Sequence, residues 1–285
     1  MTAPSDDRHR PVEHYENFPV ASWLCPPRLR RPIAAIYWFA RTADDIADEG
    51  SATVDTRLAD LDTYGNDLVA YLAGNSGSGR WPGVFAALAT AVREFRLPPA
   101  LLHALLDAFE QDARKSGAGE GYADRCELLD YCSRSANPVG RLLLHLYDVH
   151  DPVALAESDA ICSALQLINF WQDLGVDVPR GRYYLPAEDC RRHGIDPHRP
   201  ATWASHPATP ALVAELCAWA RGLMLSGAPL VHRIPGRAGW ELRLVVQGGL
   251  RILRRIERLQ HRTLQARPKL GPVDVPPMLW AAARM

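Results

Sequence analysis

The sequence predicts an all-α protein, and three observations carry that prediction. Long segments repeat apolar residues at the 3.6-residue period of a helix, alternation with a period of two is hard to find, and glycine and proline clusters separate the periodic segments. The chain has 285 residues, of which 47% are apolar and 23% charged, so a sizeable core can form without disulfides. No repeat or low-complexity linker divides the chain, which predicts a single domain over residues 1–285.

The first predicted helix covers residues 29–49. Ile33, Ile36 and Ala40 fall on one apolar stripe, Pro32 suits a first turn, and Gly50 suits a stop. Further helices are predicted over residues 54–73, 84–95, 98–114, 124–148, 153–178, 209–227 and 237–266. Loops are expected at 74–83 and 116–121, a connection with short turns only at 179–210, and a surface or partly disordered tail at 268–285.

Charge and cysteine content exclude several classes of protein. Lys and Arg total 32 against 33 for Asp and Glu, so a general nucleic-acid binder is not expected. Six cysteines without a C-x-x-C pair indicate reduced thiols in the cytoplasm. The N-terminus is charged rather than apolar, and the longest apolar candidate, Pro32 to Ala40, is too short to span a membrane. We therefore expect a protein that is soluble or at most peripheral.

One acidic cluster ends the first predicted helix, after turns that are almost wholly apolar. Asp44 and Asp48 are four residues apart, so they share one helix face about 6 Å apart along the axis. The carboxylates repel each other and lie at the negative end of the helix dipole, each effect costing about 0.3–1 kcal/mol. A compensating cation is expected, either a surface arginine at a solvated helix end or a bound ligand.

A second cluster lies more than a hundred residues later. Asn169, Asp173 and Asp177 stand at i, i+4 and i+8 on a helix that is otherwise apolar from Ile161 to Trp171. Polar groups on such a helix need a partner or a ligand. Both clusters suit helices that face one another across a bundle core.

Together the clusters predict a Mg²⁺ site that holds a diphosphate. Carboxylates without His or Cys at the same helical positions favour Mg²⁺ over zinc, and Mn²⁺ stays open as the alternative. Mg²⁺ commonly completes its octahedron with phosphate oxygens. Several cations suit a grip on those oxygens, with an exposed surface charge as the other interpretation of each: Arg41, Arg180, Arg182, Arg267 and Lys269. Arg41 is favoured because its spacing places it beside Asp44.

Three motifs, in order, resemble the squalene/phytoene synthase family, whose members join or rearrange isoprenoid diphosphates head to head. They are Tyr37-x-x-x-Arg41-x-x-Asp44-Asp45-x-x-Asp48, Tyr131-Cys-Ser-Arg-Ser-Ala-Asn137-Pro-Val-Gly-Arg141, and Gln166-x-x-Asn169-x-x-x-Asp173-x-x-x-Asp177 followed by Gly181-Arg-Tyr-Tyr-Leu-Pro186. The resemblance covers a core of about residues 12–267. It implies a single isoprenoid synthase domain with the class I terpenoid synthase fold, a helical bundle around a central cavity.

Within the family, three stretches look most like the hydroxysqualene synthase branch of bacterial hopanoid biosynthesis. They are His14 to Ser22, Ser135-Ala-Asn-Pro and Asn169-Phe-Trp-Gln-Asp173. The resemblance implies Mg²⁺-assisted ionisation of presqualene diphosphate and capture of the carbocation by water, which gives hydroxysqualene and diphosphate without NADPH. The C30 lipid substrate is compatible with peripheral association at the inner membrane face, and the oligomeric state stays open.

The resemblance also implies roles for individual residues. Mg²⁺ would be held by Asp44, Asp48, Asp173 and Asp177, with Asp45 a weaker ligand and Asn169 and Gln166 supporting the metals or the diphosphate. Further substrate contacts are expected from His14, Asn17, Phe18, Tyr37, Arg41, Asn137 and Arg182, and the ring of Tyr131 would stabilise cationic intermediates. Phe18, Ser22, Tyr37, Leu142 and Leu165 are candidate walls of a prenyl channel, with simple core packing as the alternative.

Three positions depart from the family pattern and bear on how the diphosphate is gripped. Val176 stands where many members have Glu, Gln172 where many have Arg, and His261 where Tyr is common. The missing Arg fits an enzyme that performs one ionisation. The alternatives within the family are presqualene diphosphate synthase, squalene synthase and phytoene synthase. A non-catalytic helical protein that binds a partner is disfavoured because both acidic clusters are intact.

Overall fold

The computed structural model describes residues 25–234 and 236–285, and in this part of the chain the regular structure is helical. The α-helices are α1 (Pro27–Asp48), α2 (Val54–Leu72), α3 (Pro82–Phe95), α4 (Pro99–Ala118), α5 (Arg125–Ser135), α6 (Asn137–Leu146), α7 (Pro152–Asp177), α8 (Ala187–Arg192), α9 (Thr209–Gly227), α10 (Gly236–Arg258) and α11 (Val275–Ala283). The 3₁₀ helices are η1 (Val178–Arg180), η2 (Pro200–Ser205), η3 (Ala228–His232) and η4 (Pro272–Asp274). An isolated bridge joins Gly121 to Tyr183. The all-α prediction is confirmed.

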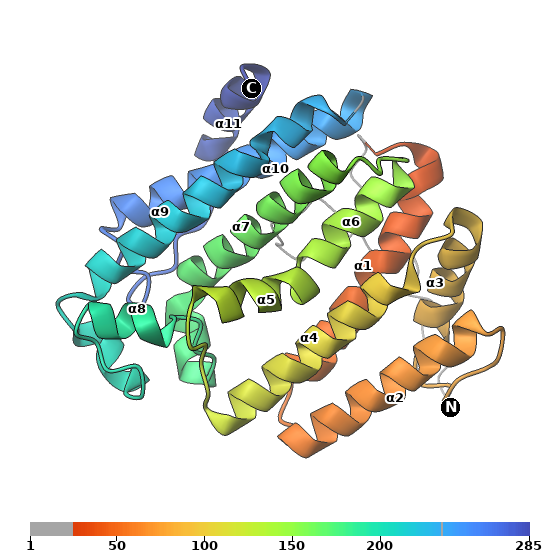
Figure 1. Ribbon diagram of the computed structural model, residues 1–285, viewed down its shortest axis with the longest axis horizontal. Helices are drawn as coiled ribbons and strands as arrows, with labels where there is room; N and C mark the ends of the chain where they lie inside the picture. Colours follow the sequence, from red (N-terminus) through yellow and green to blue (C-terminus); the bar gives the residue numbers. More distant parts are fainter. Residues whose placement is uncertain (1–24, 235) are drawn as a thin grey trace.

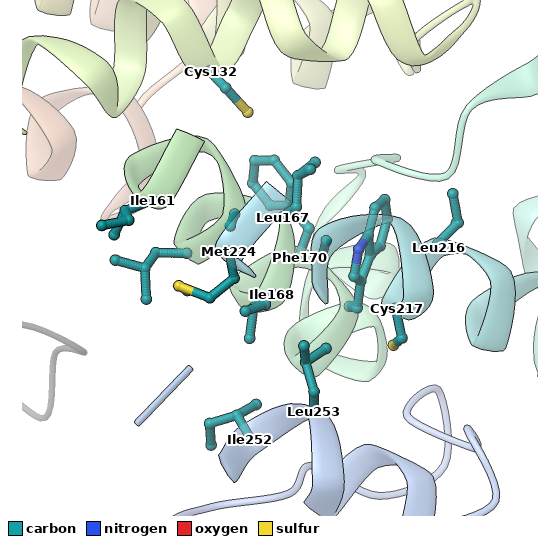
Figure 2. Close-up of a cluster of buried hydrophobic side chains, with 14 of the residues drawn as sticks. Cys132, Ile161, Leu167, Ile168, Phe170, Leu216, Cys217, Met224, Ile252 and Leu253 are labelled. Carbon is teal, nitrogen blue, oxygen red and sulfur yellow. The ribbon is translucent and has the colours of Figure 1, made fainter. Parts of the chain in front are cut away.

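The helices form two packed groups that meet along α6 and α7 (Figure 1). Helices α1 to α4 contact one another and enclose one apolar core, whereas α7 packs against α9 and α10 around a second core. Figure 2 shows part of this second core, where Phe170 of α7, Leu216 of α9 and Leu253 of α10 lie among other buried side chains. Helix α6 contributes to both cores, with Leu142 in the first and Leu144 in the second.

Local sequence explains where the two helices that carry the acidic clusters begin. Helix α1 starts at Pro27, a residue whose fixed φ suits a first turn and whose missing N–H is not needed there. The sequence assigned this role to Pro32, which instead lies inside the helix. Helix α7 starts after Asp151, whose side chain accepts a hydrogen bond from the Ala154 N–H at 2.9 Å. This cap satisfies one of the free donors of the first turn.

Two predicted helices are shorter than expected. The segment predicted as one helix over 124–148 breaks at Ala136, because Pro138 cannot donate to a carbonyl four residues earlier. The helix predicted over 237–266 ends at Arg258. Gln260 and His261 have φ values of 52° and 59°, in the left-handed region that ends a helix.

Two segments are more ordered than the sequence suggested. The connection at 179–210 holds α8 and η2 rather than turns alone, and the C-terminal tail forms η4 and α11 against α10. The tail is fixed by Asp274, which is fully buried and paired with Arg251 and Arg255. A single aspartate in a proline-rich stretch gives no periodic signal, which is why the sequence did not predict this helix.

One helical stretch, Thr209–His232, is long and apolar enough by length and composition to cross a membrane. It comprises α9 and η3. Leu212, Leu216 and Met224 of α9 are completely buried against the rest of the protein. Packing in the second core therefore accounts for part of its apolar character, since 39% of the apolar window is buried.

Candidate active site

A cavity of about 680 Å³ runs between α1, α4, α6, α7 and α10. Its volume is typical of pockets that bind small molecules, which span about 300–1,000 Å³. Along α1 its lining changes from Ile33 and Ile36 to Asp44 and Asp48, and along α7 it changes from Ile161 to the acidic C-terminal turns. The cavity therefore has an acidic end and a mainly apolar end, and Glu241 of α10 also lines its wall.

The first acidic row lies on the last turns of α1. Asp44 and Asp48 line the cavity, as their shared helix face predicts. Arg41 contacts Asp44 at 3.3 Å and Asp45 at 2.5 Å, so the predicted cation is present in the preceding turn. Asp45 is not among the residues that line the cavity, and its main partner is Arg41.

The second acidic row lies on the last turns of α7. Asn169, Asp173 and Asp177 line the cavity on one face of the helix. Asp173 accepts two hydrogen bonds from Arg267, at 2.5 and 2.8 Å. Gln172 lies at the position where an arginine is common in the family, and its amide donates to the Pro268 carbonyl at 2.7 Å. It adds no positive charge to the acidic end.

Arg182 joins the two rows. Its guanidinium lies 2.5 Å from Asp48 of α1 and 3.9 Å from Asp177 of α7, and its side chain is only 14% exposed. The chain reaches this position because Gly181 has a φ of 79°, a conformation that side chains disfavour, directly after η1. The two acidic rows are more than a hundred residues apart in the sequence, and they lie at one end of the same cavity, as their helical spacing led us to expect.

The carboxylates at this end outnumber the cations that neutralise them. Burial and the neighbouring Asp48 raise the pKa of Asp44 to about 7, and the opposing pull of Arg41 and Arg182 is smaller. Burial likewise raises the pKa of Asp177 to about 7, although Arg182 partly offsets it. Both rows also lie at helix C-termini, where the helix dipole adds negative potential. Further positive charge would stabilise the ionised forms.

The acidic residues fit divalent cations. Ligand atoms of Asp44, Asp45 and Asp48 all lie within 4.8 Å of one another, and Oδ1 of Asp48 is buried without a hydrogen-bond partner among the described residues. All these donors are hard oxygen atoms, the set that Mg²⁺ and Mn²⁺ prefer. An oxygen that is buried and unpaired costs free energy unless a cation or water reaches it.

Asp112 of α4 is a partly buried carboxylate of the cavity that the sequence did not predict. Its Oδ1 accepts a hydrogen bond from the Tyr184 hydroxyl at 3.0 Å, and burial raises its pKa. Asp112 follows Leu105 and Phe109 by seven and three residues, so it stands on the apolar stripe of its helix. A lone acid on such a stripe was the signal that could have found it.

Aromatic rings line the cavity close to the acidic end. The Tyr184 ring stacks on Phe170 with centroids 3.7 Å apart, and the Tyr131 ring lies 6.2 Å from Phe170. All three residues line the cavity, so Tyr131 is placed as predicted. Their π faces are the protein groups best suited to lie beside a carbocation.

The remaining predicted residues divide into three groups. Tyr37, Arg41, Leu165, Gln166 and Arg182 line the cavity, together with the predicted cations Arg180, Arg267 and Lys269. Asn137 and Leu142 do not line it. Asn137 is 8% exposed and accepts a hydrogen bond from Ser163 at 3.0 Å, and Leu142 is fully buried in the first core. His14, Asn17, Phe18 and Ser22 lie outside the described residues.

Two further details concern the cavity wall. At Gly140 of α6 a Cβ atom would lie 2.5 Å from Ser158 Oγ and from Cys162 Sγ, so the close approach of α6 to α7 requires glycine.

Val176, one of the departures from the family pattern, lines the cavity beside Asp177, whereas His261 does not line it.

Comparisons with known proteins agree with this geometry. The family model for squalene/phytoene synthases matches residues 12–274. Hydroxysqualene synthases of Rhodopseudomonas palustris and Sinorhizobium fredii are 34% and 32% identical, over 96% of this chain and 90% of each relative. A presqualene diphosphate synthase of R. palustris is 29% identical over 82% of this chain and 81% of the relative.

Solved structures show the same fold. The crystal structure of squalene synthase HpnC from Alicyclobacillus acidocaldarius superposes with a TM-score of 0.77 at 33% identity, covering 87% of this chain and 90% of that one. A dehydrosqualene synthase in complex with a ligand superposes with a TM-score of 0.76, and at 22% identity it supports the fold alone. With the acidic rows, the cavity and these matches combined, the chain belongs to the squalene/phytoene synthase family of isoprenoid synthases.

Proposed function

We propose that this protein is a hydroxysqualene synthase, which converts presqualene diphosphate and water to hydroxysqualene and diphosphate in squalene and hopanoid biosynthesis. The observation that carries the proposal is the meeting of two carboxylate rows at one end of a cavity whose other end is apolar. Such a cavity suits a substrate with a diphosphate head and a long hydrocarbon tail. The relatives that match nearly the whole chain carry this activity in their names.

The acidic end would bind the diphosphate head. Asp44, Asp48, Asp173, Asp177 and Asn169 are the residues that would hold divalent cations, with Asp45 as a weaker ligand. Bound Mg²⁺ would neutralise the diphosphate as it leaves. Arg182, Arg267 and Lys269 line the same end, and their N–H groups are suitable donors to phosphate oxygens. Arg41 and Arg180 add positive charge beside them.

The apolar end would shape the hydrocarbon tail and exclude bulk water. When the carbon–oxygen bond breaks, its electron pair leaves with the diphosphate and a carbocation remains. Tyr131, Phe170 and Tyr184 offer π faces to that cation. One water molecule then forms the new carbon–oxygen bond and loses a proton, which the released diphosphate can accept. Tyr131 lines the cavity and is the candidate for positioning this water, whereas Asn137 does not line the cavity and His14 lies outside the described residues.

The test is a product analysis by mass spectrometry. Purified protein with Mg²⁺ is incubated separately with presqualene, farnesyl and geranylgeranyl diphosphates, each with and without NADPH. We expect hydroxysqualene from presqualene diphosphate, no need for NADPH, and no reaction of farnesyl diphosphate. The Asp173→Asn variant is the matched inactive control.

Each other product would support a different assignment. Presqualene diphosphate formed from farnesyl diphosphate would identify a presqualene diphosphate synthase, and squalene formed with NADPH would identify a squalene synthase. Phytoene formed from geranylgeranyl diphosphate would identify a phytoene synthase. No turnover of any substrate, with diphosphate binding that does not depend on Mg²⁺, would favour a non-catalytic protein.

A further inference from the structure

Helix α11 is apolar on all sides but is not buried. Its sequence, Val-Pro-Pro-Met-Leu-Trp-Ala-Ala-Ala, contains no charged or hydrogen-bonding side chain except the indole of Trp280. Such a helix normally lies in a protein core or in a membrane. Here Ala282 is fully buried, whereas Val275, Leu279 and Trp280 are 50%, 49% and 63% exposed. Figure 1 shows α11 at the periphery of the molecule, outside α10.

The apolar face is presented by a fixed structure rather than by a fraying end. Asp274, in the turn before α11, is fully buried and forms ion pairs of 2.6 Å with Arg251 and with Arg255 of α10. At the other end of α11, Arg243 of α10 donates to the Ala282 carbonyl at 3.2 Å. Both ends of α11 are therefore held on α10.

Tryptophan and arginine pairs flank this face. The Arg284 guanidinium lies 4.2 Å from the centroid of the Trp280 ring, and that of Arg243 lies 5.4 Å from the centroid of the Trp240 ring. Trp240 is 46% exposed, and Arg243 connects it to α11 through the bond to Ala282. Aromatic rings with cationic side chains beside them are typical of surfaces that lie at the boundary between lipid headgroups and acyl chains.

The charge of this part of the chain indicates what covers the face. Residues 236–285 contain ten Lys and Arg and three Asp and Glu, a net charge of +7, whereas the whole chain is at −1. Residues 1–235 consequently carry −8. Asp274 pairs with Arg251 and Arg255, and Arg267 and Lys269 line the cavity, but the other charged residues of the 236–285 segment are six Arg and two Glu and still carry +4. A second copy of the same basic segment would bring like charges together, whereas an anionic lipid surface would complement them.

We propose that one surface of α10 and α11 docks onto an anionic lipid bilayer. This α10–α11 surface consists of Trp240, Leu279, Trp280 and Arg284. Helix α10 also forms part of the cavity wall through Ala238, Leu242 and Val245, so docking would bring the apolar part of the cavity close to the membrane. The closeness of the cavity to the membrane matters only for a lipid substrate, so this part of the proposal rests on the proposed function. The docking itself follows from the exposed side chains and the charge.

The experiment is flotation of the full chain with vesicles of phosphatidylcholine alone and of phosphatidylcholine mixed with phosphatidylglycerol. We expect flotation with the mixed vesicles, weaker flotation at high salt, and an apparent affinity at least about tenfold lower for Trp280→Glu. Val69→Glu is the matched control, because Val69 of α2 is 55% exposed and lies in the group of helices around the other core. Trp280→Ser and Arg284→Glu serve if Trp280→Glu does not fold.

The results separate three cases. Failure of the wild type to float with anionic vesicles, or equal loss in Trp280→Glu and Val69→Glu, would overturn the proposal. A dimer in light scattering that Trp280→Glu converts to a monomer, without any vesicle binding, would assign the face to a second copy instead. Turnover of detergent-dispersed presqualene diphosphate by Trp280→Glu should match the wild type. Absence of that turnover in the wild type would contradict the proposed function and leave the docking measurement intact.

Discussion

Asp274 and Asp177 are both buried carboxylates, yet their surroundings differ. Asp274 accepts hydrogen bonds from Arg251, Arg255 and the Gly271 N–H. Burial alone would raise its pKa, but these donors hold the pKa well below its ordinary value. Among the described residues Asp177 forms one ion pair, with Arg182 at 3.9 Å, and burial raises the pKa of Asp177 to about 7.

The difference separates a structural carboxylate from carboxylates suited to a ligand. Asp274 is neutralised within the protein and holds α11 on α10. Asp44 and Asp177 have arginine partners that only partly offset the effect of burial on their pKa values, so both carboxylates would gain from a bound cation. Raised pKa values with specific charge partners are common at functional sites. The two kinds of acid should therefore respond differently to mutation and to pH.

The largest expected effect is on turnover. Asp44→Asn and Asp173→Asn should each reduce turnover of presqualene diphosphate at least about a thousandfold, because each removes a carboxylate ligand from the acidic end. The fold should stay intact by circular dichroism, since both side chains line the cavity. Near-normal activity with unchanged Mg²⁺ dependence in either variant would contradict the assigned ligands.

Asp274→Ala should act on stability instead. It would leave Arg251 and Arg255, which are 14% and 28% exposed, without their shared partner. Breaking a buried ion pair in this way costs about 3–5 kcal/mol, to be measured by urea denaturation. Binding of pyrophosphate with Mg²⁺ to the folded variant should equal that of the wild type. A variant as stable as the wild type would show that α11 is held by other contacts.

The pH dependence of stability should have opposite signs for the two kinds of acid. A carboxyl whose pKa rises from 3.8 in the unfolded chain to about 7 in the folded protein binds more protons when folded, so its contribution falls as pH rises between these values. Without metal, Asp177→Asn should therefore gain in Tm over the wild type from pH 4 to pH 7, by roughly 6 °C.

Asp274 should behave in the reverse manner. Its pKa is lower in the folded protein, so its stabilising contribution is present above 3.8 and is lost as pH falls below that value. Differential scanning calorimetry of the metal-free wild type, Asp177→Asn and Asp274→Ala from about pH 2 to about pH 7 measures both trends. A difference in Tm between Asp177→Asn and the wild type that does not change with pH would mean that Asp177 is not desolvated.

The smallest expected effect belongs to Asp45. Its carboxylate is bound by Arg41 at 2.5 Å and does not line the cavity, so Asp45→Asn should reduce turnover less than about tenfold. The matched comparison is Asp44→Asn, one residue away on the same helix. Equal loss of turnover in the two variants would show that Asp45 is a full metal ligand.

Periodic patterns made most of the helices and both acidic rows predictable. Asp44 and Asp48, and Asp173 and Asp177, each repeat at one helical turn, and the helical period alone places each pair on one face. Arg41 was predictable for the same reason. The errors in the predicted helix boundaries come from single residues. Pro138 divides α5 from α6, and it stood inside an otherwise convincing apolar period.

Contacts between segments that are distant in the chain could not be predicted from the sequence. Arg182 was one of several cations, and only the fold shows that it joins α1 to α7. Asp112 had no second acid at helical spacing on the same stripe to draw attention to it. The order of α11 depends on Asp274 meeting Arg251 and Arg255, which is a tertiary event that no local pattern reports.

If both acidic rows bind one diphosphate through divalent cations, calorimetric titration with pyrophosphate should detect this binding. We expect pyrophosphate to bind the wild type with Mg²⁺ but not without it, and to bind neither Asp44→Asn nor Asp173→Asn. Binding that is independent of Mg²⁺, or that survives when either row has lost its aspartate, would contradict this expectation.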